Sequence, residues 1–161
     1  TYESVDDAIA RLSRVHRASS RNLIMLDRHG NAADLETTPT RMGRLAPDDG
    51  LLVHANHFVA PELLDAERST GSHLENSRAR HAQMQRLLDA RRGQLSVAVM
   101  QDIMRNREGA PNALCRWPED DAERDVMTFA SVIAQPTQGQ MWVAVGPPDQ
   151  HPYHHYAFTQ P

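Results

Sequence analysis

The sequence predicts an α+β fold with mostly antiparallel strands. The expected elements run in the order helix, strands, two helices and strands again, which differs from the strand–helix alternation that builds a parallel sheet. Short segments with Gly, Pro, Asn and Asp join the strands, as is usual in hairpins. The length of 161 residues suits one core, and 40% of the residues are hydrophobic.

The first predicted element is a helix over residues 5–15. Ser4 is placed to cap it, Asp7 completes a capping box, and apolar residues recur at helical spacing for about four turns. An apolar run at 22–27 is followed by a partly alternating run at 32–37, with turn chemistry between them. These two runs predict a β-hairpin.

The next part of the chain predicts two short strands and a loop. One strand is expected between Pro39 and a turn at 47–50, and the other at 51–55, where an apolar run ends at Asn56. Residues 59–73 are polar and have no clear period. They therefore predict a loop that lies over a surface or a cleft.

The second half predicts helices followed by strands. Helical spacing of apolar residues is found at 76–92 and 96–106, and residues 107–125 are irregular. Strands are then expected at 127–134, 140–145 and 156–158. The sequence contains no internal repeat and no low-complexity segment.

The composition excludes several classes of function. The formal net charge is −4 and the charges of both signs are interspersed, which argues against a nucleic-acid binding surface. All the basic charge is arginine, so Schiff-base and phosphate-loop chemistry that needs lysine is excluded. No apolar run is long enough to span a bilayer and no export signal is visible, so we expect a soluble, cytoplasmic protein.

Five histidines are candidate metal ligands. A metal site needs three or four converging ligands, and the HExxH motif does not occur. We therefore expect structural or solvent-exposed roles and no metal site. The histidines concerned are His54, His57, His151, His154 and His155.

Two residues within the chain are candidate nucleophiles. Cys115 is the single cysteine and precedes Arg116, which would favour a thiolate. Its apolar neighbours favour a small buried residue instead. Thr1 would have its own amine as base, but it leads directly into a helix cap, whereas a nucleophile of this kind usually begins a buried strand.

Asn56 is the strongest candidate for catalysis. It follows an apolar run and precedes His57 and Phe58. A side-chain amide in such a place is well suited to an oxyanion hole, where one donor contributes about 3–4 kcal/mol of transition-state stabilisation. The alternative is a turn residue that caps its own backbone.

A series of short motifs then resembles one known family. The segment Gly50-Leu-Leu-Val-His-Ala-Asn56-His57-Phe58 is similar to that family's G-x-L-x-H-x-N-H-F motif. Further matches follow the same order along nearly the whole chain, beginning at Ser4, Asn22, Gly30, Ser77, Ala113, Thr128 and Met141. The family is that of acyl-CoA:6-aminopenicillanic acid acyltransferase, also called isopenicillin-N acyltransferase. Its members are cysteine N-terminal-nucleophile hydrolases.

The resemblance implies a fold and a set of site residues. It implies an αββα sandwich, of which residues 1–161 would form the C-terminal portion of a single domain. It implies that Asn56 lines the oxyanion hole and that His57 and Phe58 contact the substrate. Arg124 corresponds to part of a serine–arginine pair that binds substrate in some members, although the serine is missing here.

The resemblance also implies an amide-bond hydrolase or acyltransferase. The substrate would be an N-acyl amine, a peptide-like amide or an acyl thioester, and no cofactor is needed. Family members cleave their own precursor to expose an N-terminal cysteine, which Cys115 does not match. We therefore expect the nucleophile on a companion chain or N-terminal half, giving a heterodimer, unless a homodimer substitutes for it. The alternatives are a non-catalytic binding or scaffold module and an enzyme that uses Thr1.

Overall fold

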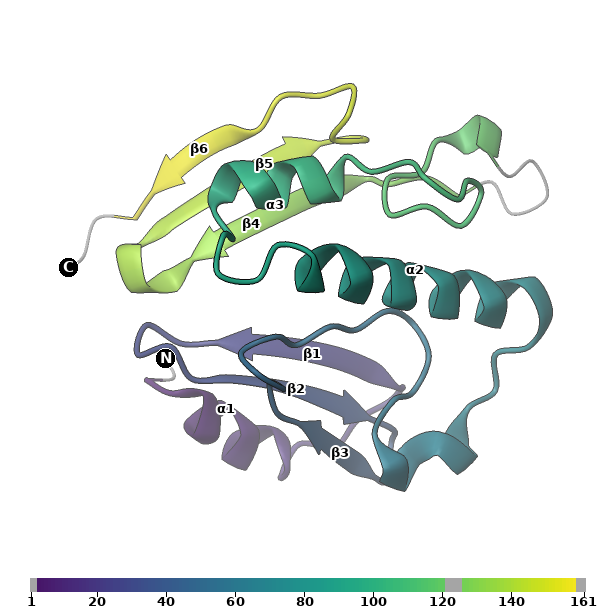
Figure 1. The fold of residues 1–161 in the computed structure, drawn as a ribbon. Coiled ribbons are helices and arrows are strands. Elements are labelled where there is room, and N and C mark those ends of the chain that lie inside the picture. Colours follow the sequence, from purple (N-terminus) through teal and green to yellow (C-terminus); the bar gives the residue numbers. More distant parts are fainter. Residues whose placement is uncertain (1–2, 121–125, 159–161) are drawn as a thin grey trace. The chain divides into compact units, whose positions relative to one another are not determined.

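The computed structural model describes residues 3–120 and 126–158 and divides the chain into two compact units (Figure 1). The first unit is Thr1–Leu74 and the second is Glu75–Pro161. Two residues singled out in the sequence, Thr1 and Arg124, lie outside the described residues.

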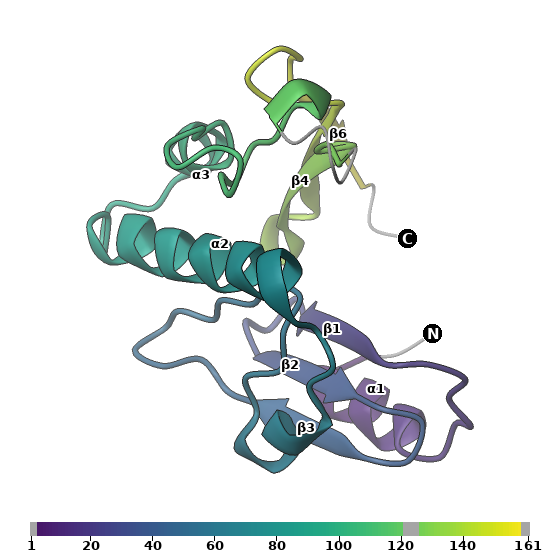
Figure 2. The same cartoon turned by 90° about the vertical axis from the view of Figure 1, so that its right-hand side faces the viewer.

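The first unit consists of a three-stranded antiparallel sheet with one α-helix. Its elements are α1 (Val5–Leu12), β1 (Arg21–Leu26), β2 (Ala32–Thr37), β3 (Met42–Leu45) and the 3₁₀ helix η1 (Pro61–Ala66). The strand order is β1-β2-β3, and α1 contacts the central strand β2 (Figures 1 and 2). The predicted hairpin at 22–27 and 32–37 is confirmed, because β1 and β2 pair from Arg21 opposite Thr37 to Leu26 opposite Ala32.

Helix α1 begins where the sequence predicts and ends earlier. The Ser4 side-chain oxygen accepts the backbone N–H of Asp7 at 3.1 Å, which confirms the N-cap. The helix ends at Leu12 and not at residue 15. The reason lies in Arg17, whose guanidinium donates to the carbonyl oxygens of Leu12 and Thr38 and so draws the chain towards the sheet.

Strand β2 forms the centre of the first unit. Every residue from Ala33 to Thr37 is buried, so both faces of the strand are covered. Alternation puts Leu35 on one face, and Asp34 and Glu36 on the other. The core of this unit therefore contains two carboxylates side by side on one face of the sheet.

The strand predicted at 51–55 is wrong. Leu51 makes one isolated bridge with Asp48, and residues 52–60 have no regular structure. Tertiary context overrides strand preference here, since the chain that follows the run is held by side-chain carboxylates, as the N–H of Val59 is by Glu36. The loop predicted at 59–73 is also partly wrong, because it contains η1 and the start of the next helix.

The second unit combines helices with another three-stranded antiparallel sheet. The elements are α2 (Gly71–Asp89, which begins at the end of the first unit), α3 (Val97–Met104), η2 (Pro118–Asp120), β4 (Ala130–Gln135), η3 (Pro136–Gln138), β5 (Gln140–Val145) and β6 (His154–Ala157). The order is β4-β5-β6, and α3 lies to one side of β4 (Figure 2). The predicted elements are all present, with ends that differ by up to five residues.

Polar side chains hold α2 against the irregular chain after α3. The Asn76 amide donates to the Asn112 side-chain oxygen at 2.8 Å, and the Gln83 amide donates to Asn106 at the same distance. Leu88 is buried near the end of the helix. Arg78 and Arg86 are exposed on the helix, whereas Arg80 is half-buried.

The α+β class and the antiparallel strands are thus confirmed. The strands form two small three-stranded sheets, and helices precede the first sheet and lie between the two along the sequence. In the described ranges 3–120 and 126–158, no helix has both the length and the apolar character needed to cross a membrane.

Candidate active site

The structure brings three predicted site residues together in one cavity. Asn56, His57 and Phe58 line a cavity of about 390 Å³ within the first unit. Its other walls come from the start of β1, from Glu36 on β2 and from the chain that follows η1. Asn56 is exposed, while His57 and Phe58 are half-buried. Consecutive residues of one irregular segment therefore face a hollow large enough for a small molecule.

Glu36 lies at the buried side of this cavity. Its side chain is fully buried, and the ladder register places it opposite Asn22 on β1 and Gly43 on β3. The Glu36 carboxylate accepts the backbone N–H of Val59 at 2.7 Å and that of Ala60 at 2.9 Å. These charge-assisted bonds satisfy a carboxylate whose burial would otherwise be strongly unfavourable.

Gly43 makes room for this arrangement. A Cβ atom at this position would lie 2.5 Å from the Cβ of Ala60 and 3.2 Å from the Oε1 of Glu62. The first of these distances is too short for any real contact. The chain around Ala60 therefore reaches the sheet only because β3 has no side chain at this point.

His54 completes the contacts of Glu36. Its Nε2 lies 2.5 Å from the Glu36 Oε1, and its Nδ1 lies 2.6 Å from the carbonyl oxygen of Ala55. Both neighbours are acceptors, so the arrangement is satisfied when both ring nitrogens carry hydrogen. The His54 side chain is only 4% exposed. This position fits the structural role expected for it.

Asp34 is the second buried carboxylate of the site. Its Oδ1 accepts the side-chain amide of Asn22. Its Oδ2 lies 4.0 Å from the His54 Nε2 and has no hydrogen-bond partner among the described residues. Burial raises the pKa of Asp34 above its usual 3.8, and His54 and Asn22 oppose that rise. The neutral form of this carboxyl is therefore favoured by its surroundings.

Glu67 holds the same segment through Phe58. Its carboxylate accepts the backbone N–H groups of Phe58 at 2.8 Å, Arg68 at 2.9 Å and Ser69 at 2.7 Å. Burial alone would raise the pKa of Glu67, but the N–H bonds from Ser69, Phe58 and Arg68 together lower it below 4.5. Glu67 is therefore ionised at neutral pH and joins two stretches of the cavity wall.

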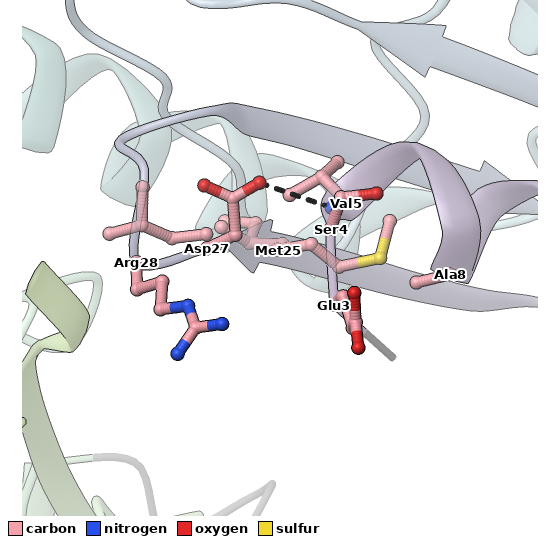
Figure 3. A pocket seen from close by; sticks show the side chains of 9 residues that line it. Glu3, Ser4, Val5, Ala8, Met25, Asp27 and Arg28 are labelled. Atoms are coloured by element: carbon pink, nitrogen blue, oxygen red, sulfur yellow. Dashed lines mark hydrogen bonds between the residues drawn. The ribbon is translucent and has the colours of Figure 1, made fainter. Parts of the chain in front are cut away.

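A larger cavity of about 610 Å³ lies elsewhere in the first unit. It is lined by the start of α1 and the end of β1 (Figure 3). Asp27 organises this region, because its carboxylate accepts the backbone N–H of Val5, His29 and Asn31. Bonds from Asn31, above all from its side chain, lower the pKa of Asp27 to about 2. Asp27 thus ties a turn to a helix start, and none of the predicted site residues lies here.

Cys115 is placed in a way that does not suit a nucleophile. It is fully buried, and its thiol donates to the Asp149 Oδ1 at 3.0 Å. Burial, together with the bond to Asp149, raises the pKa of this thiol to about 11. A buried thiol that stays protonated at neutral pH is unreactive. The same Asp149 oxygens accept the indole N–H of Trp117, which completes a local structural cluster.

The C-terminal histidines lie in the second unit. His155 stacks on Trp142 with 4.9 Å between ring centroids, and His151 packs against Gly146. Across the residues that the structure describes, no group of three or more His, Cys, Asp or Glu side chains could hold a metal ion.

Sequence reasoning gave no role to the two glutamates of the site. Glu36 lies in the run predicted as a strand at 32–37, where an acidic residue signals a buried bond partner. Glu67 lay in a segment predicted as a loop and carried no signal. Both act through backbone N–H groups, which a sequence does not display.

The comparisons with known proteins add one match. The model of the family described as acyl-coenzyme A:6-aminopenicillanic acid acyl-transferase matches residues 1–150. A comparison with curated proteins gave no match. The family model thus covers both units, including the segment that carries Asn56.

Proposed function

The chain belongs to the acyl-coenzyme A:6-aminopenicillanic acid acyl-transferase family, and we propose that it provides the oxyanion-binding part of an N-terminal-nucleophile amide hydrolase or acyltransferase. The observation that carries this proposal is the position of Asn56. Its exposed amide lies at the cavity of about 390 Å³, on a segment held by two carboxylates. The family itself is one of enzymes that act at acyl groups.

In the proposed reaction Asn56 stabilises a developing negative charge. The sulfur of an N-terminal cysteine, whose proton passes to its own α-amine, attacks the substrate carbonyl carbon. As the C–S bond forms, the carbonyl π electrons move to oxygen, and the Asn56 side-chain N–H donates to that oxyanion. Collapse breaks the bond to the leaving amine, which takes the proton from the α-ammonium group. Water or a second amine then releases the acyl group.

The proposed nucleophile lies outside these 161 residues. Cys115 is the single cysteine of the sequence, and its burial and its bond to Asp149 do not suit it for attack. We therefore propose a companion chain or N-terminal half that begins with cysteine and arises from self-cleavage of a precursor. Thr1, the rival nucleophile, has an amine of its own but no such support from the family.

The proposed substrate is an N-acyl amine, a small peptide-like amide or an acyl thioester. The cavity combines apolar wall, including Phe58, with amide donors, including Asn56. His57 is proposed to contact substrate beside them, and Arg124, which lies outside the described residues, is proposed as a substrate-binding residue on the family resemblance alone. These side chains do not choose between hydrolysis and acyl transfer. The reaction is hydrolysis when water attacks the acyl-enzyme and acyl transfer when an amine does.

The proposed companion also accounts for apolar surface on the second sheet. Val132, Val145 and Tyr156 lie on one face of β4, β5 and β6 by their register, and they are 54%, 70% and 51% exposed. Exposed apolar surface of this kind usually marks a contact with another polypeptide. We propose that this face belongs to the αββα sandwich completed by the companion in the cytoplasm.

The test is to replace Asn56 in the complete, co-expressed protein. Asn56→Ala should lower kcat for an N-acyl amine by about 10²–10³, with KM little changed, because the amide binds charge that exists only in the transition state. Gln150→Ala, which removes an exposed amide elsewhere, is the control. Intact mass spectrometry should show a polypeptide with N-terminal cysteine and an acyl adduct on it.

Three outcomes would contradict the proposal. An unchanged kcat in Asn56→Ala would remove the oxyanion role. Activity without any cysteine-initiated chain, lost in Thr1→Ala, would favour Thr1 as nucleophile. A complete protein that binds N-acyl amines and turns none over would favour a non-catalytic binding module.

A further inference from the structure

The segment from His54 to Ala60 carries the proposed oxyanion donor but has no regular secondary structure. Such a segment usually has no fixed geometry of its own, because no ladder or helix holds its backbone. A donor must nevertheless be held within about half an ångström of its working position to be effective. The question is therefore what fixes Asn56.

Glu36, on the central strand β2, is the first residue that holds the segment. Its carboxylate accepts hydrogen bonds from the backbone N–H groups of Val59 and Ala60, which follow Asn56 in the chain. It also bonds to the ring of His54, which precedes Asn56. Glu36 comes from the central strand of a sheet and is fully buried, so this anchor is itself rigid. One side chain therefore fixes the segment on both sides of Asn56.

Glu67, which follows η1, is the second residue that holds the segment. Its carboxylate receives the N–H of Phe58, two residues after Asn56, and also the N–H groups of Arg68 and Ser69. The chain after η1 is thereby tied to the segment across the cavity wall. Bonds from N–H groups to a carboxylate are about twice as strong as those between neutral groups.

Together these contacts place Asn56 between two anchors that act on the backbone. We propose that Glu36 and Glu67 are positioning residues that hold the segment 54–60 through different backbone N–H groups and so fix the Asn56 amide for catalysis. The clamp leaves the side chains of Asn56 and His57 at the cavity while it holds their neighbours. The inference rests on the proposed function, because it explains how the oxyanion donor is preorganised.

The experiment uses Glu67→Gln in the complete protein, with Glu75→Gln, an exposed glutamate of α2, as control. Glutamine keeps the volume, but its NH₂ faces an N–H group where an acceptor oxygen stood. We expect kcat to fall by roughly tenfold to a hundredfold with KM within about twofold, because the donor is displaced. Glu75→Gln should leave both constants unchanged.

A double variant separates positioning from general structural damage. If Glu67 acts through Asn56, Glu67→Gln combined with Asn56→Ala should lose no more kcat than Asn56→Ala alone. Amide hydrogen exchange should accelerate over residues 54–60 in Glu67→Gln and stay unchanged in β2. Glu36→Gln should lower kcat and accelerate exchange over residues 54–60 more strongly than Glu67→Gln does. If the buried Glu36→Gln variant does not fold, Glu67→Gln alone still tests the inference.

The outcomes distinguish this inference from the proposed function. If Asn56→Ala lowers kcat but Glu67→Gln does not, or if the two losses multiply, the positioning role is wrong and the oxyanion role stands. If Asn56→Ala has no effect, the proposed function is wrong. Faster exchange at 54–60 with unchanged kcat would also overturn the positioning role, since the loop would then be loosened without consequence.

Discussion

Asp34 carries an unsatisfied oxygen in the most buried part of the site. Its Oδ2 has no hydrogen-bond partner in the described chain, and the pKa of the carboxyl is raised, first by burial and also by Glu36. The native state therefore binds a proton at Asp34 more tightly than the unfolded chain does. The stability linked to this proton is present below pH 3.8 and is lost as pH rises through the raised pKa.

Asp34→Asn should accordingly stabilise the protein at neutral pH. Asparagine carries no charge, whereas ionising the buried Asp34 carboxyl costs free energy, so the variant's free energy of unfolding at pH 7 should exceed that of the wild type by about 1 kcal/mol. At pH 3.5 the two should agree within error. Urea denaturation at both pH values measures the difference, and Asp48→Asn at an exposed carboxyl is the control. An equal gain at both pH values would contradict this account.

Among single residues, the sequence pointed to neighbours along the chain more readily than to distant partners. Asn56, His57 and Phe58 were found together because they are adjacent in the chain and match a family motif. Glu36 and Glu67 were not assigned, because the partners of Glu36 lie 18–24 residues away and those of Glu67 are backbone groups without a side-chain signature.

At the scale of elements, hairpins with a strong turn were predictable. The chains at 22–27 and 32–37 need only local pairing, and their register follows from the turn. The apolar run at 51–55 met the same criteria for a strand, but Leu51 makes an isolated bridge with Asp48 and residues 52–60 have no regular structure. Local strand preference did not decide the structure there.

The close approach of β3 and the segment 54–60 gives a prediction at this scale. Gly43→Ala should lower the free energy of unfolding by about 1–3 kcal/mol, because the new Cβ would meet the Cβ of Ala60 at 2.5 Å. It should also lower kcat, because Ala60 is one of the residues that Glu36 holds.

A second substitution can test the cause. Ala60→Gly removes the atom that the new methyl group would meet, so the double variant Gly43→Ala/Ala60→Gly should recover part of the lost stability. Thermal or urea unfolding of all four proteins gives the coupling energy. Strictly additive losses would show that the contact with Ala60 is not the reason.

On the scale of the whole molecule, the family and the α+β class were both within reach of the sequence. Collinear motifs from Ser4 to Met141 span the length that the family model matches. Alternation in the sequence of β4 and β5 is weak, so it does not indicate which of their residues face outward. In the structure Val132 and Val145 are 54% and 70% exposed.

This exposed face predicts how the chain behaves alone. The 161-residue chain without a companion should bind a hydrophobic dye, and a cysteine-initiated companion should suppress that fluorescence. Val132→Thr with Val145→Thr should reduce dye binding while keeping the strands, since threonine is also β-branched. Dye fluorescence and near-ultraviolet circular dichroism measure the two effects. A chain that binds no dye would argue against a missing companion on this face.

The two glutamates that hold the segment 54–60 do so through backbone N–H groups. Every amino acid except proline supplies such a group, so the anchors place almost no demand on the identity of residues 57–59. Substitutions there can remake the cavity wall while the fold of the segment persists. Gly43 and Glu36, which hold the segment in place, are therefore hard to replace. The side chains that line the cavity can change, and the range of substrates can change with them.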